Sequence, residues 1–171
     1  MKINLKVEMV HEVVLILGGN QGDRKRLLEN AKTAVSSLGN LVAESQIFAT
    51  EAWGGVAKEA FLNQALVLET KLGPLRFLKQ IQQIEKNMGR KRLVKWGDRT
   101  MDIDILFWDN AMIDLPELKI PHPEVANRRF VLGPLMDVLP DLVHPVLGKT
   151  IRQLFEECPD TSNVSVFKES V

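Results

Sequence analysis

The chain has 171 residues, of which 45% are hydrophobic and 26% are charged, with equal numbers of acidic and basic side chains. This composition is too apolar for a disordered chain, and the zero net charge provides no overall basic field for nucleic acid. The lone Cys158 cannot form an internal disulfide, and no stretch approaches the ~20 apolar residues of a membrane-spanning helix. We therefore expect a single cytoplasmic domain with an N-terminal extension (1–12), a core (13–158) and a polar C-terminal tail (159–171).

The first part of the chain predicts two strands separated by a helix. Residues 13–17 form a short apolar run, rich in β-branched side chains, which is typical of a buried strand. After a glycine-rich segment, apolar residues recur every three or four positions up to Gly39, which predicts a helix with Asp23 as its N-cap. Residues 41–50 alternate and predict a second strand. The inward positions of the helix are predicted to be Leu27, Ala31, Ala34 and Leu38.

The next elements are a third strand and a second helix. Residues 61–70 predict the strand, with leucines on one face. Pro74 then begins a helix, because proline is favoured in a first helical turn, and Gly89 ends it. The predicted inward positions of this helix are Leu78, Ile81, Ile84 and Met88.

Residues 101–108 are strongly strand-like and complete the order strand, helix, strand, strand, helix, strand. That order predicts an α+β fold with a ferredoxin-like βαββαβ core, in which helices flank an antiparallel sheet. Further extended chain is predicted at 113–120, and short helices at 130–138 and 150–157.

Two aspartates, Asp102 and Asp104, carry the most specific chemical signal. At ~3.3 Å rise per residue their Cα atoms lie roughly 6.6 Å apart, and both side chains leave one face of the strand. Ile103, Ile105 and Phe107 are then expected on the opposite face. Two carboxylates 4 Å apart repel by about 4 kcal/mol at an effective dielectric of about 20, so a cation is expected beside them. Mg²⁺ fits because it binds one or two carboxylates together with substrate phosphates.

A basic segment precedes these aspartates. Residues 90–99 hold five cationic side chains against one acid, and they include Trp96. Phosphoryl transfer requires such a loop beside a metal site, because guanidinium groups neutralise charge that develops in the transition state. From the residues alone two other interpretations stay open: a solvated loop that only balances the acids, and an ion-paired strand face without metal.

A second basic element lies between residues 120 and 130. Two prolines hold His122 in an extended segment, and Arg128 begins the next helical stretch. Both are candidate phosphate ligands, although a lone histidine more often has a structural role. The glycine-rich segment 18–22 lacks the lysine and the spacing of a phosphate-binding loop, so we interpret it as a tight turn.

Together these segments resemble the 6-hydroxymethyl-7,8-dihydropterin pyrophosphokinase family of folate biosynthesis. Its members transfer the terminal pyrophosphoryl group of ATP to the pterin hydroxymethyl group and release AMP. The resemblance spans about residues 13–155, and the Arg-x-x-Asp-x-Asp run at 99–104 is its most specific part. The motifs that carry it are Leu17 to Asp23, Phe61-Leu62-Asn63, Gly89-Arg90, Trp96 to Asp104, Pro121-His122-Pro123 and Arg128-Arg129-Phe130.

On the nucleotide side, the resemblance implies that Asp102 and Asp104 hold two Mg²⁺ ions on the ATP phosphates. Arg90 and Arg99 would be catalytic cations acting on the transferred group. The other implied ATP-binding residues are Gln82, Glu85, Arg92, Trp96, His122 and Arg128.

On the acceptor side, the resemblance implies a pterin pocket made of Thr50, Trp53, Phe61, Asn63 and Phe130. The implied partners are ATP and 6-hydroxymethyl-7,8-dihydropterin, with neither nucleic acid nor membrane, and we expect a monomer. Two alternatives use the same residue types. A Mg²⁺-dependent nucleotidyltransferase would release pyrophosphate instead of AMP, and a non-catalytic ferredoxin-like binding module would turn over nothing.

Overall fold

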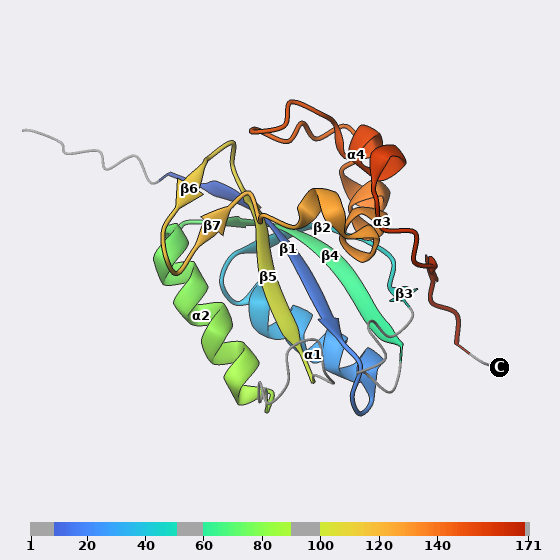
Figure 1. Ribbon diagram of the computed structural model, residues 1–171. Coiled ribbons are helices and arrows are strands. Elements are labelled where there is room, and N and C mark those ends of the chain that lie inside the picture. Colours follow the sequence, from blue (N-terminus) through green and yellow to red (C-terminus); the bar gives the residue numbers. More distant parts are fainter. Residues whose placement is uncertain (1–8, 51–59, 90–99, 170–171) are drawn as a thin grey trace, which may run out of the picture.

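The computed structural model describes residues 9–50, 60–89 and 100–169, which form an antiparallel sheet with helices on both faces (Figure 1). Three long strands lie side by side in the order β5-β1-β4. The α+β architecture predicted from the element order is therefore present. The bounds of these strands are His11–Gly19 for β1, Phe61–Thr70 for β4 and Asp102–Trp108 for β5.

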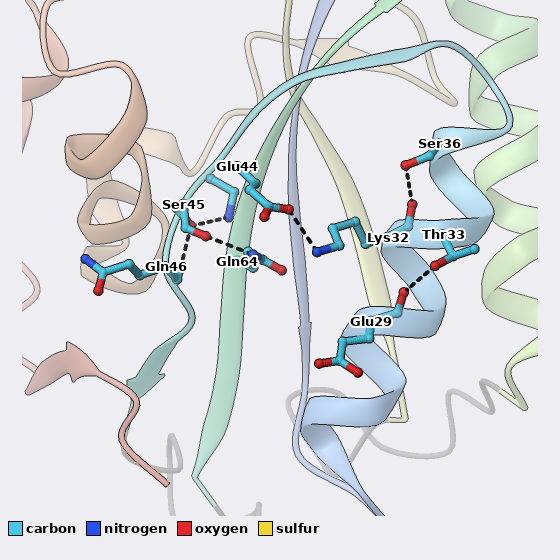
Figure 2. A network of polar contacts seen from close by, with 9 residues as sticks. Glu29, Lys32, Thr33, Ser36, Glu44, Ser45, Gln46 and Gln64 are labelled. Carbon is cyan, nitrogen blue, oxygen red and sulfur yellow. Dashed lines mark hydrogen bonds and ion pairs between the residues drawn. The ribbon is translucent and has the colours of Figure 1, made fainter.

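The predicted strand at 41–50 is wrong in one respect, because the structure divides it into β2 (Asn40–Glu44) and β3 (Phe48–Thr50). Both pair with β4, and Ser45 interrupts the ladder between them. The Ser45 hydroxyl accepts from the Ala65 backbone N–H at 2.9 Å, and the Ser45 carbonyl accepts from the Gln64 side chain at 2.8 Å (Figure 2). A side chain that takes over a ladder hydrogen bond ends regular pairing at that point.

Helices α1 (Arg24–Ser36) and α2 (Pro74–Asn87) cover one face of the sheet. Asp23 is the N-cap of α1 as predicted, and its carboxylate accepts from the Arg26 backbone N–H at 3.2 Å. In both helices the buried face is rotated from the predicted one. Packing against the sheet, and not the apolar period alone, determines which side chains are buried. The fully buried residues are Leu28, Ala31 and Val35 in α1, and Phe77, Ile81 and Glu85 in α2.

The opposite face carries the two predicted short helices, α3 (Arg129–Val138) and α4 (Ile151–Glu157). They enclose a second core against the alternate side chains of β1 and β4. A short 3-10 turn (Val125–Asn127) precedes α3. The extended chain predicted at 113–120 is a small hairpin of β6 (Ile113–Asp114) and β7 (Lys119–Ile120). None of the described helices is both long enough and apolar enough to cross a membrane.

Two further predictions are corrected by strand pairing. The pairing of β1 with β5 shifts register between Val14 and Leu15, so the Phe107 side chain packs in the core beneath α3 and α4 instead of beside Ile103 and Ile105. A bulge of this kind moves every later side chain to the other face. The polar tail also contains a strand, β8 (Val164–Val166), which pairs with β3.

Candidate active site

The two predicted metal ligands lie at the start of β5. Asp102 and Asp104 are partly exposed, whereas Ile103 between them is buried in the core beneath α1 and α2. The aspartates therefore leave the face that carries α3 and α4. Asp104 is paired with Ile16 of β1, whose side chain belongs to the core on that same face. The two-residue period of the strand thus places both carboxylates together, as the sequence predicts.

A glycine lies between the two halves of the site. Gly18 of β1 is paired with Asp102 on one side and with Asn63 of β4 on the other. Residues directly opposite in antiparallel strands project from the same face, so Asn63 and Asp102 share one face, two strand spacings of about 4.8 Å apart. A Cβ at Gly18 would lie 2.2 Å from Asn63 Oδ1. Only glycine leaves room for the Asn63 amide in this position.

Three predicted acceptor-pocket residues lie on this same face. Thr50 of β3 is paired with Phe61 of β4, and Asn63 follows two residues later on β4. Thr50 and Asn63 are both buried, yet Thr50 Oγ1 and Asn63 Nδ2 have no hydrogen-bond partner among the described residues. Buried polar groups are normally satisfied, and those left unpaired call for an explanation such as a ligand. These two atoms are donors suited to the edge of a polar heterocycle.

His122 is tied to the strand that carries the aspartates, because its backbone N–H donates to the Leu106 carbonyl at 2.9 Å. Its Nδ1 accepts from the Glu124 backbone N–H at 3.1 Å. Burial lowers the pKa of His122; the charge of Asp104 opposes this shift, and Arg128 adds to it. A neutral ring that accepts at Nδ1 carries its proton on Nε2, which makes Nε2 a hydrogen-bond donor.

The start of α3 supplies a cation beside an aromatic ring. Arg128 has an extended backbone at the N-cap position, and its guanidinium lies 5.8 Å from the centroid of the Phe130 ring. Both side chains are partly buried. An arginine held against an aromatic face keeps its planar fork available for a phosphate. This end of α3 therefore places the predicted phosphate ligand Arg128 beside the predicted stacking residue Phe130.

The two α2 residues that the resemblance places beside the nucleotide lie in different surroundings. Gln82 is exposed, whereas Glu85 is 4% exposed. Glu85 Oε2 accepts from the backbone N–H of Ile103 at 3.2 Å. That amide lies between the two aspartates on an edge strand, where a backbone donor needs a partner. Glu85 thus anchors the strand that presents the carboxylates.

Five predicted site residues lie outside the described part of the chain: Trp53, Arg90, Arg92, Trp96 and Arg99. The sequence pattern assigns Gly18 to a tight turn and gives it no role in the site, but the structure places it within β1. The short spacing from the apolar run to Gly18 is a signal that Gly18 could belong to the strand. Its partners could not be identified, however, because the register with β4 and β5 is non-local.

The donor set fits magnesium bound together with a phosphate substrate. Among the described residues no group of three or more histidine, cysteine, aspartate or glutamate side chains forms a metal-binding cluster. Asp102 and Asp104 instead offer two carboxylates on one face. Mg²⁺ is commonly bound by one or two carboxylates, with its remaining ligands from water and phosphate oxygens. The residues present therefore match that mode of binding.

Comparison with known proteins gives a consistent family. Residues 14–140 match the model of the 7,8-dihydro-6-hydroxymethylpterin-pyrophosphokinase family. The 2-amino-4-hydroxy-6-hydroxymethyldihydropteridine pyrophosphokinase of Pseudomonas aeruginosa is 37% identical over 153 residues, which are 88% of this chain and 94% of that protein. The enzyme of the same name from Synechocystis is 36% identical over 160 residues, covering 91% of this chain and 80% of that protein.

Solved structures show the same fold. The Plasmodium falciparum HPPK-DHPS with pteroate superposes with a TM-score of 0.72 at 19% sequence identity. The match covers 87% of this chain but 42% of that longer chain. At this identity the likeness concerns the fold alone.

Proposed function

The chain belongs to the 7,8-dihydro-6-hydroxymethylpterin-pyrophosphokinase family, and from this premise we propose how its own residues divide the work. It is an ATP-dependent pyrophosphokinase of folate biosynthesis: the pyrophosphoryl group passes from ATP to the pterin hydroxymethyl group, and AMP is released. One observation supports the division of the site into a nucleotide side and a pterin side. The register at Gly18 separates a buried amide, Asn63, from a carboxylate pair on a single face of the sheet.

The carboxylate side is the nucleotide side in this proposal. Asp102 and Asp104 hold two Mg²⁺ ions against the ATP phosphates. When bound, these ions neutralise phosphate charge and align the group for in-line displacement. The Nε2–H of neutral His122 and the guanidinium of Arg128 donate to the triphosphate. Gln82 completes this side, and Glu85 contributes through the strand that it anchors.

The amide side is the pterin side. Asn63 Nδ2 and Thr50 Oγ1 donate to the acceptors of the pterin ring, which explains why they are buried without partners among the described residues. Phe61 and Phe130 stack on the ring faces, an interaction worth about 0.5–1.5 kcal/mol beyond the burial of area. The hydroxymethyl oxygen then points toward the carboxylate side and attacks the β-phosphorus of ATP as the bond to the α-phosphate breaks.

The remaining assignments concern residues outside the described ranges. We propose that Arg90 and Arg99 neutralise charge on the transferred group, with Arg92 and Trp96 on the nucleotide and Trp53 beside the pterin. Removal of a cation that acts mainly in the transition state lowers kcat more than it weakens ATP binding.

The test is a pair of variants measured on both substrates. Asn63→Ala should raise the pterin Kd sharply and leave ATP binding nearly unchanged. Phe130→Ala should also raise the pterin Kd sharply, with a smaller loss of ATP affinity because Arg128 loses the ring that it contacts. The nucleotide product of the wild-type enzyme, with Mg²⁺ and the reduced pterin, should be AMP. Pyrophosphate release would indicate the nucleotidyltransferase alternative, and a pterin Kd unchanged in both variants would place the pocket elsewhere.

A further inference from the structure

The N-terminus of α3 is capped by a residue from the far end of the chain. Arg128 occupies the N-cap position but makes no side-chain capping hydrogen bond. Instead the backbone N–H of Arg129 donates to Asp160 Oδ2 at 3.0 Å. The other oxygen of Asp160 accepts from the Ser162 backbone N–H at 2.9 Å. A carboxylate at this position satisfies a first-turn amide and complements the positive end of the helix.

The same segment then pairs with β3. Val164 is directly opposite Thr50, and the Phe167 backbone N–H donates to the Ile47 carbonyl at 2.8 Å. The Val164 side chain also packs on α3, because a Cβ added at Gly133 would lie 3.1 Å from Val164 Cγ1. One short strand therefore contacts β3 and α3 simultaneously.

A third contact reaches the start of β4. The Phe167 ring lies 6.0 Å from the guanidinium of Arg24. Arg24 Nη1 in turn donates to the Ala60 carbonyl at 2.8 Å, directly before Phe61. The segment 160–167 is thus linked to the three described elements that carry proposed pterin-binding residues: α3 with Phe130, β3 with Thr50 and β4 with Phe61.

The exposure of this segment favours a role in positioning its neighbours over a large contribution to the core. Residues 160–167 are partly buried or exposed, and Val166 is 36% exposed; Phe167 alone among them packs, partly buried, against the core beneath α1 and α2. Hydrophobic stabilisation scales with the apolar area removed from water, so β8 itself, which has no fully buried residue, contributes little to the core. The segment also lies beyond the family match, which ends at residue 140.

We propose that residues 160–167, here called the C-terminal clamp, fix the spacing of the walls of the pterin pocket, with Asp160 and Val164 as positioning residues. The proposal rests on the pterin-binding role given above to Thr50, Phe61 and Phe130. The clamp touches neither substrate. It holds the start of α3 against the end of β3, so that ring stacking by Phe130 and hydrogen bonding by Thr50 act on the same bound molecule.

The ionisation of Asp160 is consistent with this arrangement. Burial by itself would raise its pKa, but the hydrogen bonds from Ser162 and Arg129 and the charge of Arg129 lower the pKa below that of an ordinary aspartate. The carboxylate is therefore ionised at neutral pH, in the form that accepts from both backbone amides.

The experiment breaks the clamp at two independent points. Asp160→Ala removes the cap of α3, and Val164→Pro disturbs the pairing with β3 without touching that cap. Binding of 6-hydroxymethyl-7,8-dihydropterin is measured by calorimetry with Mg²⁺ and a non-hydrolysable ATP analogue. Each variant should raise the pterin Kd about fivefold to tenfold, the size expected for loss of one capping interaction. The Kd of the ATP analogue should rise less than the pterin Kd, because Arg128 lies at the start of α3 whereas Asp102, Asp104 and His122 lie outside that helix.

Two further variants serve as controls for the change in pterin Kd. Asp160→Asn keeps an oxygen that can accept from the Arg129 amide, so it should restore much of the pterin affinity lost in Asp160→Ala. Asp141→Ala is the matched control, because the side chain of Asp141 is exposed and its ion pair among the described residues, with Arg152 at 3.4 Å, is a surface contact. Lower melting temperatures with an unchanged pterin Kd, in either clamp variant, would overturn the proposal. Failure of the wild-type protein to bind the pterin would instead overturn the proposed function.

Discussion

Asn63 of β4 and Asp102 of β5 share one face of the sheet, and both are paired in register with Gly18 of β1. The residue between them has no side chain, and the Asn63 amide occupies the space that a Cβ at position 18 would take. A side chain at position 18 would displace that amide and so disturb the proposed acceptor half of the site. The relationship explains why this register matters for chemistry as well as for the sheet.

Replacement of Gly18 by alanine should damage both stability and pterin binding. Its Cβ would lie 2.2 Å from Asn63 Oδ1, so either the amide or the strand must move. We expect a loss of about 1–3 kcal/mol in unfolding free energy, as for other overpacked sites, and a weaker pterin affinity. Urea unfolding and calorimetry measure the two effects. Gly73→Ala is the matched control, because nothing lies within 4 Å of a Cβ there; equal effects in the two variants would contradict the argument.

Asp102→Asn and Asp104→Asn should each lose most turnover while the fold survives. Asparagine keeps the size of the side chain but removes the negative charge on which Mg²⁺ binding depends. Steady-state kinetics over a Mg²⁺ titration, together with melting curves, measure this. Asp114→Asn is a suitable control, since Asp114 is an exposed residue of the β6–β7 hairpin bonded to Lys119. Full activity of either site variant at modest Mg²⁺ would remove the assignment.

Glu85→Ala should lower both stability and kcat. The substitution removes the acceptor of the Ile103 amide, and an unsatisfied buried donor costs about 1–3 kcal/mol. The strand between the two aspartates would then lose its anchor. Glu85→Gln retains an acceptor oxygen and should keep more of both properties.

The control for Glu85 is Gln80→Ala, an exposed position on the same helix. The readouts also distinguish two roles. A fall in melting temperature and kcat with ATP affinity retained indicates an anchor. A rise in the ATP Kd at unchanged melting temperature would instead indicate a direct nucleotide ligand, contrary to this expectation.

His144 should make the domain less stable in weak acid. It is 6% exposed, and its Nδ1 accepts from the Val146 and Leu147 backbone N–H groups. Burial lowers the pKa of His144 from its ordinary value of 6.5. The unfolded chain therefore takes up a proton first, so unfolding free energy should fall as the pH drops below 6.5 and level off below the folded pKa.

The measurement is urea unfolding between pH 7.5 and 5 for the wild type and His144→Asn. Asparagine can still accept from the two backbone amides but does not titrate, so its pH dependence should be shallower. His122, whose pKa is also lowered, is common to both proteins and cancels in the difference. Parallel profiles would show that His144 does not contribute.

Local sequence pattern alone determined several structural features of this protein. The bounds predicted for the strand at 61–70 match β4, Asp23 caps its helix, and Asp102 and Asp104 share a face, because periodicity and capping involve neighbours in the chain. The motif order also identified the family, which the comparisons confirm.

Only the tertiary structure decided how these pieces meet. The pairing of Gly18 with two strands, the burial of Glu85 against the Ile103 amide and the capping of α3 by Asp160 each join residues distant in sequence. The division of 41–50 at Ser45 likewise depends on its bond to Ala65. Strand register and helix rotation are fixed by which surfaces pack against each other, and a sequence period specifies a face without specifying its partner.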